Sequence, residues 1–135
     1  AEIALGYVKG NAVKYKIDPN FFEKHDIHLH VPEGAVPKDG PSAGITLTTA
    51  IISALTHRPV LANLAMTGEV TLRGNVLAIG GLKEKTMAAH RCGIETELIP
   101  KQNLKDLDDI PETVRQSLKI YPVESMDQVL KRALV

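Results

Sequence analysis

Apolar and polar residues recur along this chain with spacings that alternate between those of helices and those of strands. The clearest helix is predicted at residues 125–134, where five apolar side chains fall on one stripe. They are Met126, Val129, Leu130, Ala133 and Leu134. Ser125 can cap this helix, and Gln128 follows three residues later, which is the spacing of a capping box.

The N-terminal segment, residues 1–15, also has helical spacing, with Leu5, Val8 and Ala12 on one side. No capping residue precedes it, so the predicted helix begins abruptly. We therefore expect the sequence to be a part excised from a longer chain.

The segments between these two ends predict a mixture of strands and helices. Strands are expected at 26–32, 64–72, 76–80, 95–100 and 119–123, and further helices at 42–56, 83–92, 101–107 and 111–118. The residues RGN between the second and third strands suit a tight hairpin, and Gly93 suits the end of a helix. The fold class is therefore mixed α/β, of the α+β kind.

Composition narrows the class of protein. A chain of 135 residues suits one compact domain, residues 1–135, and its sixteen basic and sixteen acidic residues cancel. No net charge therefore draws it to nucleic acid or to a membrane. The single cysteine, Cys92, cannot form an internal disulfide, and no apolar run is long enough to span a bilayer. These features favour a cytoplasmic protein.

The stretch PKDGPSAG, residues 37–44, places Ser42 between glycines at the start of the uncharged helix predicted at 42–56. A serine there commonly serves as an N-cap. Glycines and a helix N-terminus can also cradle a phosphate. A third role is nucleophilic catalysis, in which the N–H groups of the first turn hold an oxyanion. The residues alone leave these three roles open.

A nucleophilic serine needs a base, and the histidines are poor candidates. His28 and His30 lie on the outer face of a predicted strand, and His25 and His57 lie in predicted turns, where side chains are usually solvated. The H-x-H pair has no second cluster of metal-ligating residues after it. We therefore expect no metal site.

Lys85 is the better candidate for a base. On a helical wheel of residues 82–92 it shares one stripe with apolar side chains, whereas Lys83 lies on the opposite side with charged residues. The apolar members of the stripe are Leu82, Ala88, Ala89 and Cys92. A lysine on such a face extends to water, forms a buried ion pair, or loses its charge. A neutral amine could accept the proton of a serine, as in a serine–lysine dyad.

Two long motifs, PKDGPSAG and MTGEVTLRGNVLAIGGLKEKTMAAHRCGI, closely resemble the proteolytic domain of the Lon family of ATP-dependent proteases, of the bacterial and mitochondrial A type. The resemblance runs from about Phe21 to the C-terminus. It implies that Ser42 is the nucleophile and Lys85 the general base, which agrees with the wheel. It also implies that Thr67 holds the lysine amine and that Asp39 lies beside the nucleophile in a loop with closed and open forms.

The resemblance has implications for the whole protein as well. The fold would be that of the Lon protease domain, related to the ribosomal S5 domain 2-like group. The chain lacks a G-x-x-x-x-G-K-[ST] loop, so the ATPase and substrate-binding regions, with ATP and magnesium, would belong to other parts of the full chain. No cofactor is expected in this part.

The implied activity is ATP-dependent serine endopeptidase cleavage of unfolded or damaged proteins by a hexameric ring. The resemblance connects this activity with protein quality control and the stress response. The bacterial cytoplasm is favoured over the mitochondrial matrix. Two alternatives are a phosphate- or nucleotide-binding domain and a catalytically silent scaffold of the same fold.

Overall fold

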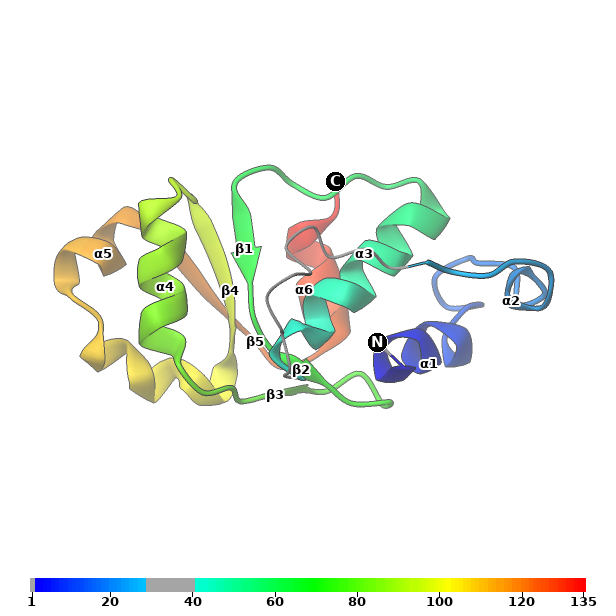
Figure 1. Cartoon of the computed structure of the whole chain (residues 1–135), viewed down its shortest axis with the longest axis horizontal. Coiled ribbons are helices and arrows are strands. Elements are labelled where there is room, and N and C mark those ends of the chain that lie inside the picture. The colour runs from blue at the N-terminus through cyan, green and yellow to red at the C-terminus, as the bar shows by residue number, and fades with distance from the viewer. Residues whose placement is uncertain (1, 29–40) are drawn as a thin grey trace.

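A computed structural model of the chain describes residues 2–28 and 41–135. The helices, two of which are 3₁₀ helices labelled η, are α1 (Glu2–Gly10), α2 (Phe21–Lys24), η1 (Pro41–Ala43), α3 (Gly44–Thr56), α4 (Leu82–Arg91), η2 (Lys101–Asp109), α5 (Glu112–Ser117) and α6 (Met126–Ala133). The strands are β1 (Leu64–Met66), β2 (Glu69–Val70), β3 (Val76–Leu77), β4 (Thr96–Pro100) and β5 (Lys119–Val123). This is the mixed α/β pattern predicted from the sequence (Figure 1).

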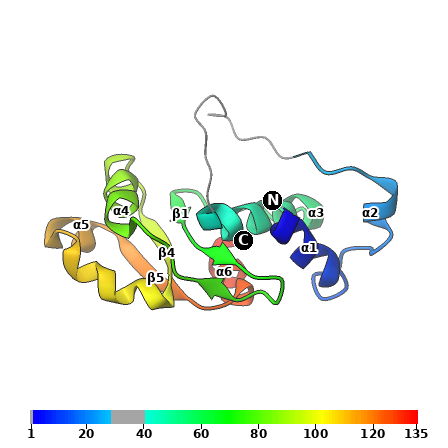
Figure 2. The ribbon, with the colours of Figure 1, turned by 60° about the horizontal axis from the view of Figure 1, so that its bottom comes forward.

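A parallel sheet in the order β1-β4-β5 lies between two groups of helices. Helices α4 and α5 lie on one side, and α1, α3 and α6 lie on the other (Figure 1). A second view places α1 and α2 again at the opposite end of the molecule from α4 and α5 (Figure 2). Parallel strands require crossover connections, which α4 and α5 provide.

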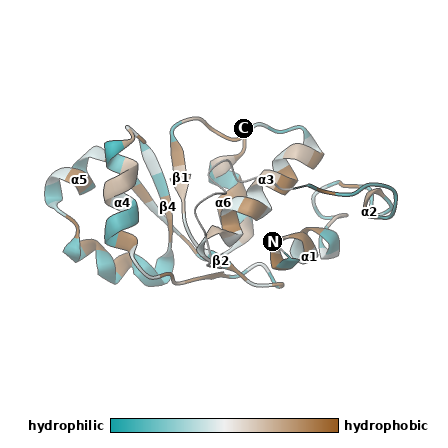
Figure 3. Cartoon of the chain, viewed as in Figure 1, coloured by the Kyte–Doolittle hydropathy of each residue, from teal (hydrophilic) through white to brown (hydrophobic). Residues whose placement is uncertain are grey.

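The two faces of the sheet contribute to two separate hydrophobic clusters. Leu98 and Val123 belong to the cluster with α1, α3 and α6. Ile99 and Ile120 belong to the cluster with Leu82 of α4 and the residues of α5. This division follows the two-residue period of a strand. In Figure 3, α3 is mostly brown or pale, whereas α4 alternates between brown and teal turns.

The two predicted terminal helices are confirmed, with one change. All five residues of the C-terminal stripe are buried, and the Ser125 hydroxyl accepts a hydrogen bond from the Gln128 backbone N–H. The Gln128 side chain accepts from the N–H of Glu124, one residue before the cap. The N-terminal helix ends at Gly10 instead of continuing to residue 15, and turns follow it.

The strand predicted at 64–72 is broken into β1 and β2, which belong to different sheets. The Thr67 N–H still bonds to Leu98 of β4, the register partner of Met66, whereas the next N–H, that of Gly68, bonds to Ser42, so the pairing with β4 ends there. Beyond it, β2 and β3 form the expected antiparallel hairpin, with Gly74 at a φ of 85°.

The other predicted elements are confirmed except for three. The strand expected at 76–80 is the two-residue strand β3, which ends at Leu77. The helix expected at 101–107 is the 3₁₀ helix η2, which extends to Asp109. Of the strand expected at 26–32, residues 26–28 are not extended into a strand, and the rest lies outside the described residues. No helix in the described part of the chain is both long and apolar enough to cross a membrane.

Candidate active site

Ser42 lies in the short helix η1, one turn before α3, and its hydroxyl does not cap that helix. The N-cap of α3 is Ala43, without a side-chain capping bond. The Ser42 Oγ instead accepts a hydrogen bond from Lys85 Nζ at 2.8 Å. The commonest role for a serine at this place, that of an N-cap, is therefore wrong for Ser42.

The backbone of Ser42 is fixed to the start of β2. The Gly68 N–H donates to the Ser42 carbonyl at 2.9 Å, and the Ile45 N–H donates to the Gly68 carbonyl at 3.1 Å. Gly44 permits this approach, because a Cβ added there would lie 2.9 Å from the Val70 backbone nitrogen. Gly44 therefore allows two backbones to lie close together.

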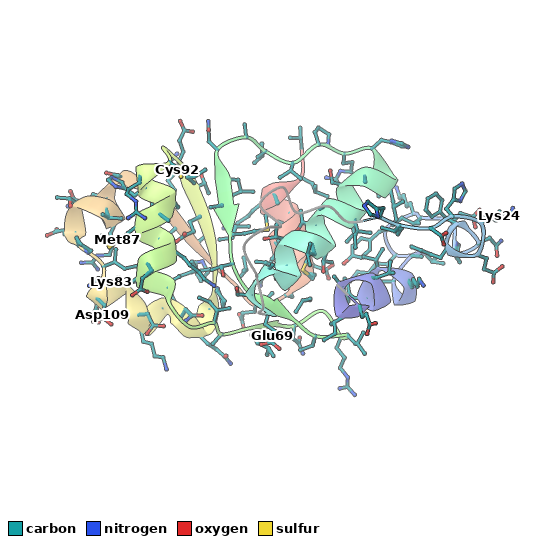
Figure 4. All side chains as sticks on the ribbon, viewed as in Figure 1. Lys24, Glu69, Lys83, Met87, Cys92 and Asp109 are labelled. Carbon is teal, nitrogen blue, oxygen red and sulfur yellow. The ribbon has the colours of Figure 1, made fainter. Side chains whose placement is uncertain are left out.

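Lys85 reaches the serine from α4, on the other side of β1. Its side chain is half-buried, while Leu82 and Ala89 are buried and Lys83 is exposed, as the wheel predicted. Figure 4 shows Lys83 on the side of α4 away from β1. Cys92 is exposed, contrary to the wheel, because α4 ends at Arg91 and Cys92 is already the C-cap.

The loop before α4 is held by a buried asparagine. Asn103 of η2 accepts from the Ile79 N–H and donates to the Ile79 carbonyl, both at 2.9 Å. Only 2% of Asn103 is exposed. Gly81 then begins the helix at a φ of 70°, a conformation that favours glycine. This pairing fixes where α4 starts.

Thr67 lies beside both groups. Its side chain is buried, and its Oγ1 accepts from Lys85 Nζ at 3.5 Å. The same hydroxyl donates to the Ser42 carbonyl, also at 3.5 Å. The structure thus brings Ser42, Lys85 and Thr67 together from three elements separated in sequence.

A second polar pair lies behind Lys85 and was not predicted. Thr86, fully buried on α4, donates to Glu97 Oε1 of β4 at 2.7 Å. Burial raises the pKa of the Glu97 carboxyl, and the hydrogen bond from Thr86 partly opposes that rise. Two signals could have indicated this pair. Thr86 is four residues from Leu82, on its helical stripe, and Glu97 lies inside the strand predicted at 95–100, directly before its apolar residues 98–100.

The other residues considered from the sequence fall into two sets. Asp39 lies outside the described residues, as does His30. The side chains of His25, His28 and His57 are exposed, as the sequence predicted for turns and an outer face.

Comparison of the sequence with known proteins identifies the family of the chain. The family model of the Lon protease (S16) C-terminal proteolytic domain matches residues 1–135. The chain is 63% identical over 134 residues to the Lon protease of Chloroflexus aggregans and 60% identical over 134 residues to that of Brevibacillus choshinensis. Each match covers 99% of this chain but only 16% and 17% of the respective relative. A third relative, the Lon protease of Clostridioides difficile, is 58% identical over the whole chain, which covers 17% of it. The chain belongs to the family of Lon protease C-terminal proteolytic domains.

Proposed function

We propose that this domain is a serine endopeptidase in which Ser42 is the nucleophile and Lys85 is the general base. The observation that carries the proposal is the 2.8 Å contact between Lys85 Nζ and Ser42 Oγ. A general base must lie within hydrogen-bonding distance of the proton that it removes. Thr67, with its hydroxyl at 3.5 Å from the amine, would keep the lysine directed at the serine.

The reaction would begin with the amine of Lys85 in its neutral form. The 2.8 Å distance between Nζ and Ser42 Oγ suits a hydrogen bond in either direction. With a neutral amine, the serine hydroxyl donates and the lone pair on Nζ accepts the proton. As the proton moves to Nζ, Ser42 Oγ attacks the peptide carbonyl and a tetrahedral intermediate forms. Backbone N–H groups at the start of α3 would stabilise its oxyanion, helped by the positive end of the helix dipole.

The second half of the reaction would use the same two residues. The ammonium of Lys85 gives its proton to the leaving amine as the peptide C–N bond breaks, which leaves an acyl ester on Ser42. A water molecule then transfers a proton to the neutral Lys85 while its oxygen attacks the ester. Collapse of this intermediate returns the proton to Ser42 Oγ and releases the acid.

The activity of the whole protein is a wider proposal, because the chain spans only about a sixth of the length of its relatives. We propose that the longer protein degrades unfolded or damaged proteins in an ATP-dependent manner as a hexameric ring. ATP and magnesium would act in an ATPase module outside these residues. This degradation would contribute to protein quality control and to the stress response in a bacterial cytoplasm.

Replacement of Ser42 by alanine tests the proposed chemistry. The variant should lose hydrolysis of a fluorogenic unstructured peptide and keep the melting temperature of the parent domain within a few degrees. The Ser42 side chain makes no capping hydrogen bond to α3, so its removal should not destabilise that helix. Retained turnover in the alanine variant would exclude Ser42 as the nucleophile.

The same assay tests where the ATP dependence resides. We expect weak or no cleavage of short unstructured peptides, no cleavage of a stable folded protein, and no effect of ATP with magnesium on either. A backbone locked in a fold cannot be aligned with a recessed serine. ATP-stimulated degradation of the folded protein by this chain alone would contradict the proposal that ATP acts in a module outside these residues.

A further inference from the structure

The buried pair Thr86–Glu97 has no part in the reaction described above, yet it is one residue away from the proposed base. Thr86 is 0% exposed, and Glu97 is 2% exposed. A carboxyl group is costly to bury, and burial raises its pKa. Thr86 Oγ1 donates to this carboxyl at 2.7 Å. A buried polar group that could be replaced by an apolar side chain requires an explanation.

The position of the pair on α4 provides that explanation. Consecutive residues of a helix project about 100° apart, so the direction of one side chain sets that of the next. Thr86 is bonded to β4, in the centre of the sheet. Rotation of α4 about its axis would break this bond and would swing Lys85 away from Ser42 at the same time.

The same segment of β4 also fixes the other side of the dyad. The Leu98 carbonyl, next to Glu97, accepts from the Thr67 N–H at 3.1 Å. Gly68, the next residue along, donates to the carbonyl of Ser42 at 2.9 Å. Four hydrogen bonds, together with the chain segments between them, therefore form a closed ring. They join Thr86 to Glu97, Thr67 to Leu98, Gly68 to Ser42, and Lys85 Nζ to Ser42 Oγ.

We propose that Thr86 and Glu97 are positioning residues that set the rotation of α4, and thereby hold Lys85 Nζ against Ser42. The inference rests on the proposed serine–lysine dyad. Neither residue touches the substrate in this scheme, and their effect passes through Lys85. A displacement of about 1 Å in a catalytic group can lower the rate on the order of a hundredfold. Free rotation of α4 would therefore slow the reaction.

Thr86→Val tests the proposal, because valine keeps the shape of threonine and removes the donor. We expect kcat for a fluorogenic peptide to fall by about ten- to a hundredfold with little change in KM. Phosphonylation of Ser42 by a fluorophosphonate, in which the serine oxygen displaces fluoride from phosphorus, should slow by a similar factor. Thr86→Ser keeps the hydroxyl and should restore most of both rates. If a packing defect alone were responsible, serine, which lacks the methyl group, would be at least as harmful as valine.

A double variant covers the case in which valine prevents folding by leaving the Glu97 carboxyl unpaired. In Thr86→Val/Glu97→Met both partners are apolar, an exchange that is often nearly neutral for stability. We expect it to melt near the parent temperature and still to show the low kcat. A folded double variant with the parent kcat and the parent rate of phosphonylation would overturn the proposal. Ser42→Ala serves as the separate control, because turnover in that variant would refute the dyad itself.

Discussion

Gly44→Ala probes the close approach between the nucleophile turn and β2. The added Cβ would lie 2.9 Å from the Val70 backbone nitrogen and 3.0 Å from its Cγ1. Relief to an ordinary contact of about 3.4 Å requires a separation of about 0.5 Å. Overpacking of this kind costs about 1–3 kcal/mol, while alanine regains at most about 1 kcal/mol over glycine as a helix former. We expect net destabilisation of about 1 kcal/mol.

The effect on activity should exceed the effect on stability. Gly44 begins α3 directly after η1, so the displacement is transmitted to Ser42. Because a misplacement of about 1 Å costs about a hundredfold, one of about 0.5 Å should cost about tenfold in kcat. The assay compares peptide turnover and urea denaturation with those of Gly10→Ala, where an added Cβ meets nothing within 4 Å. A Gly44→Ala variant with the parent kcat would refute the reasoning.

Two further predictions concern the charges around α4. Lys85→Arg should abolish peptide cleavage, because a guanidinium keeps its proton. Lys83→Arg should be tolerated, because Lys83 is exposed. Equal turnover of the peptide by the two variants would disprove the orientation of α4. Burial raises the pKa of Glu97 in the folded state above its ordinary value of 4.5, so the unfolded chain releases that proton first as the pH rises. Stability therefore falls as the pH rises above that value, and the loss is complete once the folded state also ionises and persists at higher pH. Urea denaturation should show the parent losing stability relative to Glu97→Gln as the pH rises above 4.5, and an unchanged difference would contradict the burial argument.

Periodicity predicted the elements whose own residues determine them. The C-terminal helix has its cap, its stripe and its last turn within ten residues, so local rules suffice. The same is true of α4, where the wheel distinguished Lys85 from Lys83. Local rules failed where distant backbone groups compete. The strand at 64–72 breaks because the Gly68 N–H bonds to Ser42, far away in sequence, instead of continuing the pairing with β4.

The site divides in the same way. Motifs and resemblance predicted that Ser42, Lys85 and Thr67 belong together, and the geometry has all three in contact. The capping role of Ser42 was a reasonable inference from a serine before a helix, but α3 begins two residues later. The pair Thr86–Glu97 was missed because each residue, taken alone, looks like an ordinary polar residue of a helix or a strand. Its meaning depends on the packing of α4 against β4.

The central claim is that Ser42 is a nucleophile activated by Lys85, and covalent labelling tests it most directly. The chain, Lys85→Arg and Lys83→Arg are each treated with a fluorophosphonate, and the modified residue is identified by mass spectrometry of the digested protein. The account predicts one adduct, on Ser42, in the parent chain and in Lys83→Arg, and none above background in Lys85→Arg. Labelling of Ser42 at the parent rate in folded Lys85→Arg, or an unlabelled Ser42 in an active parent domain, would contradict it.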